Sequence, residues 1–409
     1  MSTFGKAFIA GVMLFAPSIA LVAVTEAQKP IRVGASLSQT GAYAALGQNQ
    51  RRGHQLCVKH TNDKGGVLGR KLELVVYDDE SDPATAVRLY EKLITQDRVD
   101  LVLGPYGSPI TEAVADMNEK YRMPMLAPNA GTTSIFKKGR KFIFMVASPG
   151  EAYLEGFIDL AATRGLKTMA LIHEDTIFPK AVAHGGRELA KKRGLTVVLV
   201  EAYPKGTTDF SAILTKVRAA NPDVLAAGTY FEDAVAISRQ TKELNLNPKM
   251  YLVTIGVVLP KFHEVLGRTA EFVYGPSLWE PELVTLRAGG LIPIARRYPG
   301  AREFVEAHHR AYPGADLSHH TAGGYGSCRV LTEAVKRAGS LDREKIRDAI
   351  LKLDINTVYG AFKVDQDGFQ IAHKMVTFQW QDGKKVIVWP EELAAIKARF
   401  PTPPWSQRP

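Results

Sequence analysis

Short apolar runs and amphipathic stretches alternate along most of the chain. The runs, rich in β-branched residues, predict the strands Ile31–Leu37, Lys71–Tyr77, Phe142–Val146, Thr168–His173, Leu195–Tyr203, Asp223–Ala227 and Met250–Thr254. Helical spacing of apolar positions predicts a helix ending at His60 and the helices Glu151–Arg164, Ala181–Lys192, Phe210–Ala219, Asp233–Leu244, Ala301–Ala311, Thr321–Ala338 and Asp342–Leu351. Because alternating strands and helices form parallel sheets, this order predicts two doubly wound α/β units.

The stretch from Asp100 to Thr133 holds two strand ends that lie close together in sequence. One apolar strand ends in Gly-Pro, a helix starts at Ser108, and a second strand ends in Pro-Asn-Ala-Gly-Thr-Thr. Carboxyl ends of neighbouring parallel strands lie side by side, and backbone N–H groups and helix N-termini converge there on an anion. The stretch therefore predicts one half of an anion-binding site. For Ser108 alone, the alternative is a simple helix N-cap.

Turn signals mark two other parts of the chain. Residues 78–83 are predicted to end a strand and cap the next helix, with Pro83 near its first turn. From Val273 onward the α/β pattern stops, and Val358–Trp389 is predicted to form short strands. Residues 365–368 and 381–383 have the composition of hairpin turns in that region.

Residues 1–27 are predicted to be a signal peptide. Lys6 supplies the positive start, an apolar run extends from Ala7 to Val24, and residues 25–27 offer a small-x-small cleavage site. A membrane anchor is the alternative, since the run approaches the length that spans a bilayer. Because Pro17 interrupts the run and no Cys follows it for lipid attachment, we expect export and cleavage.

The composition is that of a soluble globular protein, with 45% hydrophobic and 23% charged residues. The formal net charge of +10 is spread along the chain, and no nucleic-acid-binding module accompanies it, so nucleic-acid binding is not expected. The charge favours anionic small ligands to a modest degree. For Cys57 and Cys328 we expect two buried free thiols, and a disulfide across two helices is the alternative.

Several sequence blocks together resemble one protein family. In chain order they are IRVGASLSQTGAYAALG, KGGVLGRKLELVVYDDESDP, GPYGSP, MPMLAPNAGTTS and FKVDQDG. Each is a short turn signature, but the ordered set resembles the periplasmic solute-binding proteins of ABC transporters, in the branched-chain amino-acid-binding (Leu/Ile/Val) family. The resemblance implies the type I periplasmic binding fold, in which two doubly wound α/β lobes are joined by three crossover segments.

The resemblance also implies how this chain divides. The crossings are expected near Ala147–Gly150, Tyr274–Ser277 and Thr357–Gly360. Lobe one is expected to comprise 31–146 and 277–355, lobe two 147–276 and 356–400, and the C-terminal tail 401–409. Both cysteines would then lie in lobe one, so a disulfide between them remains the alternative. The implied protein is a periplasmic monomer that binds a small carboxylate ligand and docks on ABC permease subunits of the inner membrane, without cofactor or metal.

The resemblance implies that hydroxyl and backbone N–H groups of the two turns in Asp100–Thr133 hold the ligand carboxylate. The expected contacts there are Tyr106, Gly107, Ser108, Asn129, Ala130, Gly131 and Thr132. Three loops of the second lobe complete the implied site, namely Ser148–Tyr153, Thr229–Glu232 and Ile255–Val257. The expected contacts from these loops are Ser148, Tyr153, Tyr230, Phe231 and Ile255, and the first lobe adds Tyr43.

This chain departs from the family pattern where an ammonium group would bind. Members that hold an α-amino acid place an Asp in the first of these loops and an acidic residue in the last, whereas this chain has Ser-Pro-Gly and Ile-Gly-Val there. An ammonium buried without an anionic partner is costly. Aromatic residues that suit a flat ring are Tyr43, Tyr106, Tyr153, Phe178, Tyr230, Phe231 and Trp279. We therefore expect an aromatic acid as the ligand.

Three alternatives remain beside this expectation. An amino acid stays open as the ligand because Glu174-Asp175 or Glu232-Asp233 could reach an ammonium. An enzyme is disfavoured, since the chain has no dinucleotide fingerprint, Walker loop, nucleophile elbow or His-Glu-x-x-His motif. The pairs His308-His309 and His319-His320 point apart if helical, so no metal site is expected. The third alternative is a ligand sensor that passes its signal to a receptor.

Overall fold

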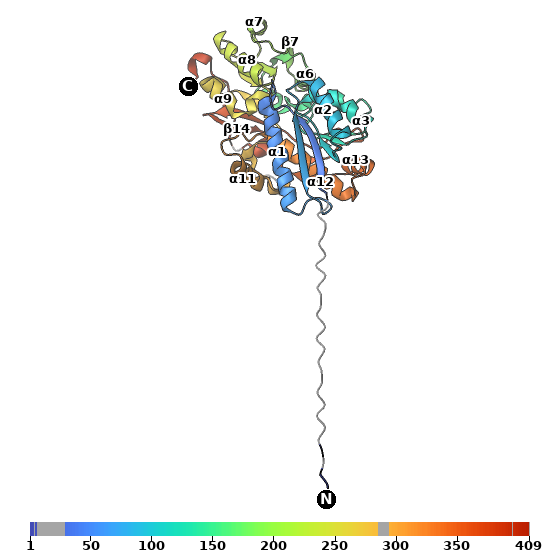
Figure 1. Cartoon of the computed structure of the whole chain (residues 1–409). Coiled ribbons are helices and arrows are strands. Elements are labelled where there is room, and N and C mark those ends of the chain that lie inside the picture. The colour runs from blue at the N-terminus through green and yellow to red at the C-terminus, as the bar shows by residue number, and fades with distance from the viewer. Residues whose placement is uncertain (4, 6–28, 285–293, 395, 409) are drawn as a thin grey trace.

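Strands and helices alternate from Ile31 onward, as the apolar pattern predicts (Figure 1). The computed structural model describes residues 1–3, 5, 29–284, 294–394 and 396–408. The predicted signal peptide, residues 1–27, falls almost wholly outside the described residues and stays a prediction. None of the helices in the described ranges combines the length and the apolar character that crossing a bilayer needs.

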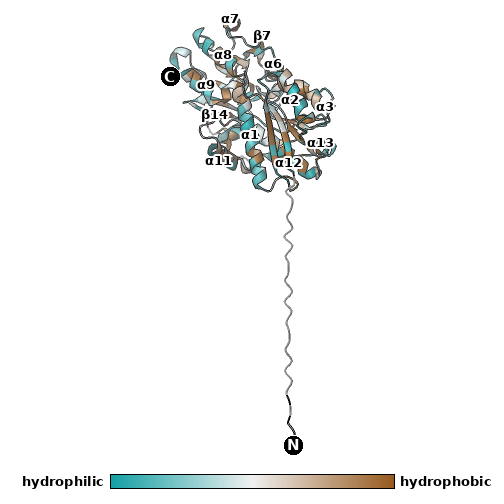
Figure 2. Cartoon of the chain, viewed as in Figure 1, coloured by the Kyte–Doolittle hydropathy of each residue, from teal (hydrophilic) through white to brown (hydrophobic). Residues whose placement is uncertain are grey.

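The first sheet is parallel and has the strand order β2-β1-β3-β4-β5. Its strands are β1 (Ile31–Leu37), β2 (Leu72–Asp78), β3 (Leu101–Leu103), β4 (Met125–Ala127) and β5 (Ile143–Met145). The helices between them are α1 (Ala44–Asp63), α2 (Pro83–Thr95), α3 (Ser108–Lys120) and the short α4 (Thr133–Phe136). Figure 2 shows hydrophobic strands beside α1, which is the expected character of parallel strands that helices cover on both faces.

The second sheet has the order β14-β13-β10-β9-β8-β6-β7, and only its β13 and β14 pairings are antiparallel. Its strands are β6 (Thr168–Glu174), β7 (Thr196–Tyr203), β8 (Val224–Gly228), β9 (Met250–Val253), β10 (Tyr274–Ser277), β13 (Val376–Gln381) and β14 (Lys384–Trp389). Its helices are α5 (Glu155–Thr163), α6 (Ile177–Lys192), α7 (Ser211–Ala220), α8 (Phe231–Glu243) and α9 (Pro260–Leu266). The two sheets and their helices form the two lobes.

The segment that follows β10 returns to the first lobe. It contains α10 (Ile294–Arg297), α11 (Ala301–Ala311), α12 (His319–Ala338), α13 (Arg343–Leu351) and the small hairpin of β11 (Ile355–Thr357) and β12 (Gly360–Phe362). Short 3₁₀ turns are η1 (Gly150–Ala152), η2 (Ile255–Val258), η3 (Gly267–Ala270), η4 (Pro281–Val284), η5 (Glu391–Leu393) and η6 (Trp405–Gln407). Because α12 packs on α1 and β4, these later helices complete the first lobe.

The turn at residues 365–368 lies beside the first sheet. The Met145 N–H donates to the Gly368 carbonyl at 2.8 Å, and Lys137 binds the carboxylates of Asp365 and Asp367. The turn at residues 365–368 therefore contacts β5 of the first sheet, although it belongs to the range expected for lobe two. The exact lobe boundaries remain a prediction.

Helices α1 and α12 pack closely and are joined covalently. A β-carbon at Gly53 would overlap the Thr321 carbonyl, and one at Gly324 would overlap the Gln50 carbonyl, so the two backbones approach through glycines. Cys57 and Cys328 form a disulfide across this contact, with a Cα–Cα distance of 6.1 Å. The expectation of two free thiols is wrong. The two helices are distant in sequence, and nothing in the local pattern indicates that they are neighbours.

Two predicted helix starts are wrong by several residues. Helix α6 begins at Ile177 rather than Ala181, because Pro179 lies in the first turn, where its missing N–H has no intrahelical acceptor to lose. The helix predicted from Glu151 is instead the 3₁₀ turn η1 followed by α5 from Glu155. Apolar spacing alone does not distinguish a 3₁₀ turn from a first α-helical turn.

Candidate functional site

The two turns of the Asp100–Thr133 stretch lie side by side, as the sequence predicts. Tyr106 and Asn129 form an isolated parallel bridge beyond the ends of β3 and β4. Gly107 precedes α3 with a φ of 80°, a conformation that favours glycine. Helix α3 then begins at Ser108, with Pro109 in its first turn, so its N-terminal amides point to the carboxyl edge of the sheet.

The Ser108 hydroxyl does not cap its own helix. It accepts a hydrogen bond from the Thr132 N–H at 3.3 Å, so it links the first turn to the second. The alternative of a simple N-cap is therefore wrong. The Thr132 hydroxyl is buried and has no hydrogen-bond partner among the described residues. That these two hydroxyls hold a ligand carboxylate stays a prediction.

A narrow pocket with about 10 Å³ of accessible space lies at these turns. Its wall is formed by Tyr106, Gly107, Ser108, Asn129, Tyr153, Phe178, Tyr230, Ile255, His319 and His320. Strand-end turns of both lobes contribute: Tyr153 follows η1, Tyr230 precedes α8, and Ile255 begins η2. The two lobes therefore share one site.

Aromatic rings from the two lobes touch each other at this pocket. The Tyr43 ring lies 4.9 Å from the Tyr230 ring and 5.8 Å from the Tyr106 ring, centroid to centroid. Within the second lobe, the Phe178 ring lies 5.0 Å from the Tyr153 ring and 6.2 Å from the Tyr230 ring, centroid to centroid. Tyr43 thus packs against two wall residues, although it is not itself part of the wall.

Several expected contact residues support the pocket from outside its wall. Ala130 and Thr132 are buried in the second turn, and the Gly131 carbonyl accepts from the Gly150 N–H at 2.6 Å. The Ser148 hydroxyl lies 2.9 Å from His373 Nδ1, and the Lys261 ammonium lies over the Phe231 ring. Trp279 is buried against Phe304. Packing and hydrogen bonds therefore account for the positions of Ser148, Phe231 and Trp279, whereas the Thr132 hydroxyl has no partner among the described residues.

Sequence reasoning missed His319 and His320 as wall residues. They begin α12, whose N-cap Ser318 accepts from the His320 N–H. The predicted helix started two residues later, so both histidines were considered only as a metal pair. Burial lowers the pKa of His319 well below its usual range and that of His320 to about 3, so both imidazoles are neutral. A Ser directly before two buried histidines is the signal that could have placed them at a helix start.

No charged side chain lies in the wall. Of the described residues that line the pocket, none is Asp, Glu, Lys or Arg. Asp233 is instead held behind it, where it accepts from the Tyr203 hydroxyl at 2.6 Å and the Tyr230 N–H at 2.8 Å. Burial raises the pKa of Asp233 to about 7.

The other acidic residues that could pair with a ligand ammonium also lie outside the pocket wall. Glu174 is buried and accepts from the Thr176 hydroxyl at 2.7 Å. Asp175 pairs with Lys180, and Glu232 is exposed. None of these acids is a wall residue.

A buried glutamine joins the two turns from behind. Gln50 on α1 donates to the Gly104 carbonyl at 2.8 Å and accepts from the Asn129 side chain at 2.9 Å. His54 lies one helical turn further along, with Nδ1 2.8 Å from the Gly324 carbonyl and Nε2 3.3 Å from Gln50 Nε2. Because a carbonyl only accepts, His54 Nδ1 carries the hydrogen and Nε2 accepts from Gln50. This network holds Asn129 in place.

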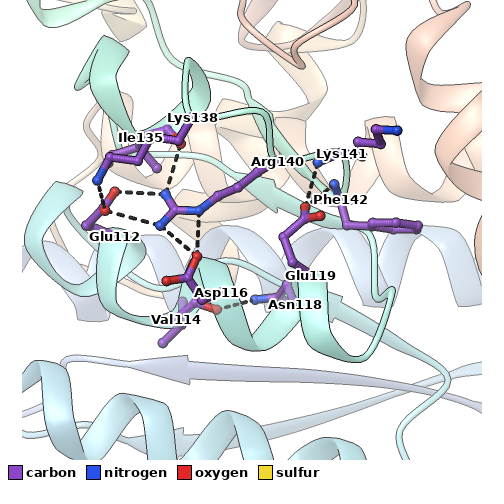
Figure 3. Close-up of polar contacts among 10 residues, drawn as sticks. All are labelled: Glu112, Val114, Asp116, Asn118, Glu119, Ile135, Lys138, Arg140, Lys141 and Phe142. Atoms are coloured by element: carbon purple, nitrogen blue, oxygen red, sulfur yellow. Dashed lines mark hydrogen bonds and ion pairs between the residues drawn. The ribbon is translucent and has the colours of Figure 1, made fainter.

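Arg140 holds the second turn against α3 on its other side (Figure 3). Its guanidinium donates to the carboxylates of Glu112 and Asp116 on α3, at 3.0 and 2.8 Å. The same group donates to the carbonyl of Ile135 in α4, directly after the turn that carries Thr132. The spacing between Ser108 and Thr132 is thus supported by polar contacts on both sides.

Comparison with known proteins gives consistent matches over nearly the whole chain. The model of the family described as periplasmic binding protein matches residues 30–385. The Leu/Ile/Val-binding protein homolog 7 of Brucella melitensis is 26% identical over 406 residues, which are 95% of this chain and 99% of that protein. A leucine-binding protein from Thermotoga maritima has a TM-score of 0.77 at 26% identity, covering 87% of this chain and 97% of its own. A solute-binding protein of R. palustris in complex with benzoate has a TM-score of 0.75 at 19% identity, covering 90% and 98%.

Proposed function

Because the chain belongs to the periplasmic binding protein family, we propose that it captures an aromatic carboxylate between its lobes and delivers it to an ABC importer. The family binds ligands and is not a family of enzymes. Permease subunits of the inner membrane are the expected partners. The alternative is a branched-chain or other amino acid, in keeping with the Leu/Ile/Val-binding and leucine-binding relatives. A structural neighbour in complex with benzoate is consistent with an aromatic carboxylate as the ligand.

The first turn supports a carboxylate at the lobe-one side of the pocket. Amides at the start of α3 have no intrahelical acceptor, and the helix dipole stabilises an anion there by about 0.3–1 kcal/mol. Ser108 is in the wall, and the unpaired Thr132 hydroxyl adjoins it through the bond from the Thr132 N–H. A carboxylate that accepts from these groups would satisfy a buried hydroxyl that otherwise costs free energy.

The uncharged wall is the observation that carries the choice of ligand. A zwitterionic amino acid would place its ammonium in a pocket where, among the described lining residues, no carboxylate is present. The desolvation of an unpaired ammonium costs several kcal/mol. An aromatic acid has no such group, and its ring would pack against Tyr153, Phe178 and Tyr230.

Contacts near the first crossing support closure of the lobes over the ligand. The Thr133 hydroxyl donates to the Glu151 carboxylate at 2.6 Å, and Glu151 belongs to η1, which packs on α6. On the opposite side of the cleft, the Lys205 ammonium lies 5.0 Å from the centre of the Tyr43 ring. Opening would break these contacts, and closure would bring Tyr153 and Tyr230 onto the ring while the crossing segments absorb the rotation.

Ligand class is tested by thermal unfolding of the purified protein. Benzoate or a cinnamate should raise the melting temperature, because a ligand that binds only the folded state stabilises it, by about 3 kcal/mol at a hundred times the Kd. Leucine should leave it unchanged. Benzamide, which keeps the ring and lacks the negative charge, is the matched control and should be inactive. Stabilisation by leucine alone would overturn the aromatic proposal.

The carboxylate site is tested by two substitutions. Ser108→Ala and Thr132→Val should each weaken binding of the ring acid by about 1–3 kcal/mol, because each removes a hydroxyl donor to a charged group. Isothermal titration calorimetry measures the change. Ser134→Ala removes a hydroxyl two residues away at an exposed position and should keep the wild-type affinity. Unchanged affinity in both site variants would remove the assignment.

A further inference from the structure

His319 differs from the other histidines near the cleft in how its ring is hydrogen-bonded. For His320, both ring nitrogens have partners, Ser318 Oγ at 3.2 Å and the Tyr106 hydroxyl at 3.3 Å. For His373 also, both nitrogens have partners, the Ser148 hydroxyl and the Tyr359 carbonyl. For His319 only Nδ1 is engaged, at 2.9 Å from Ser277 Oγ.

The tautomer of His319 follows from the hydrogen bonds of Ser277. The Ser277 hydroxyl has one hydrogen, and it donates that hydrogen to the Trp279 carbonyl at 2.9 Å. Towards His319 the hydroxyl oxygen must therefore accept, so Nδ1 carries the imidazole hydrogen. In the neutral ring the other nitrogen, Nε2, then has a lone pair and acts only as an acceptor.

The acceptor of His319 belongs to the pocket wall. Within the described part of the chain Nε2 has no hydrogen-bond partner, and the side chain, only 1% exposed, lines the pocket together with Tyr106 and Tyr153. A charged imidazole is not expected at this place, since burial favours the neutral ring. Nε2 is thus an acceptor of the pocket wall that no protein donor occupies, and a ligand that brings a donor to it gains a hydrogen bond.

We propose that His319 determines specificity by accepting a hydrogen bond from a hydroxyl on the ligand ring, which makes the ligand a hydroxylated aromatic carboxylate. This inference rests on the proposed function, in which Ser108 and Thr132 hold the carboxylate. A phenolic hydroxyl suits the site because it donates one hydrogen bond without adding charge. An ammonium would also donate, but a neutral imidazole does not compensate its charge.

The wild-type protein provides the first test by calorimetry with benzoate, 3-hydroxybenzoate and 4-hydroxybenzoate. At least one hydroxylated acid should bind about tenfold more tightly than benzoate, the upper part of the range for one net hydrogen bond. Equal affinity of the three acids would overturn the role of His319 and leave the proposed function standing. Failure of all three to bind would overturn both.

Two variants separate the acceptor from the architecture of α12. His319→Asn keeps an N–H donor near the position of Nδ1 for Ser277 but lacks the Nε2 acceptor. His319→Phe keeps the ring and removes both nitrogens. In both variants the preference for the hydroxylated acid over benzoate should fall to about threefold or less. A preference that persists in both would contradict the proposal.

The tautomer itself gives a measurement that does not depend on ligand affinity. In protein labelled with ¹⁵N at histidine, long-range correlation spectra should show His319 as a neutral ring with hydrogen on Nδ1 at pH 7. Addition of the preferred hydroxylated acid should shift the Nε2 resonance, because that nitrogen gains a hydrogen bond. A ring with hydrogen on Nε2 would contradict the proposal.

Discussion

Replacing Cys57 and Cys328 together by Ala should lower the free energy of unfolding by about 2–5 kcal/mol. The disulfide joins residues 271 positions apart, so it removes much of the chain entropy of the unfolded state. It also fastens α1, which carries Gln50, to α12, which carries His319, so it holds two supports of the pocket together. Urea unfolding at equilibrium measures the change.

A reducing agent provides the matched comparison for the disulfide. Wild-type protein unfolded with excess reductant should lose about the same free energy as the double variant, while the double variant itself should not respond to reductant. Free-thiol titration of the unfolded, unreduced wild type should find no reactive Cys. Two reactive thiols, or equal unfolding midpoints of wild type and variant, would contradict the prediction.

Acidification from pH 6.5 to pH 4 should cost the protein about 3 kcal/mol of stability through His54 alone. Burial lowers the pKa of His54 from 6.5 to about 4. Since the unfolded state then binds a proton that the folded state excludes, the contribution is complete above pH 6.5. It falls as the pH drops, by about 1.4 kcal/mol per pH unit, and the loss is complete near pH 4. Unfolding midpoints in urea at a series of pH values measure the slope.

The variant His54→Asn isolates this contribution from other titrating groups. Asn keeps an N–H donor for the Gly324 carbonyl, and it does not titrate in this range. The wild-type protein should therefore lose stability relative to the variant between pH 6.5 and pH 4, whatever other groups contribute to both. Parallel pH profiles of the two proteins would exclude the buried neutral state of His54. Protonation of His54 would also place an N–H against Gln50 Nε2, so the hydrogen bonds through which Gln50 holds Asn129 should weaken.

Much of the fold could be predicted because its signals are local. Asp82 caps α2 by accepting from the Thr85 N–H, with Pro83 in the first turn, as the Asp-Pro pair indicates. The turn pair around Ser108 and Asn129 was predicted because parallel strands place consecutive carboxyl ends at one edge. Helix starts were less certain, as Ile177 shows, since the first turn tolerates residues that later turns do not.

The predicted site was incomplete because it came from two strand-end turns and from loops that the family resemblance implied. Tyr153, Tyr230 and Ile255 were expected from that resemblance, and the structure brings them to the same pocket as Ser108. His319 reaches that pocket from a helix far along the chain, and no local pattern links it to the other residues. Conversely, Ser148 has a suitable hydroxyl in a suitable loop, yet that hydroxyl bonds His373.

The amino-acid sequence by itself determined the alternation of elements, the place of the two turns and the absence of acidic residues from Ser148–Gly150 and Ile255–Val257. These depend on residues that are neighbours in the chain. Only the tertiary structure decided that Cys57 meets Cys328, that Ser108 bonds Thr132 rather than its own helix, and that His319 lines the same pocket as Ser108. Each of these depends on distances between segments far apart in sequence, which packing of the whole chain sets and local periodicity does not encode.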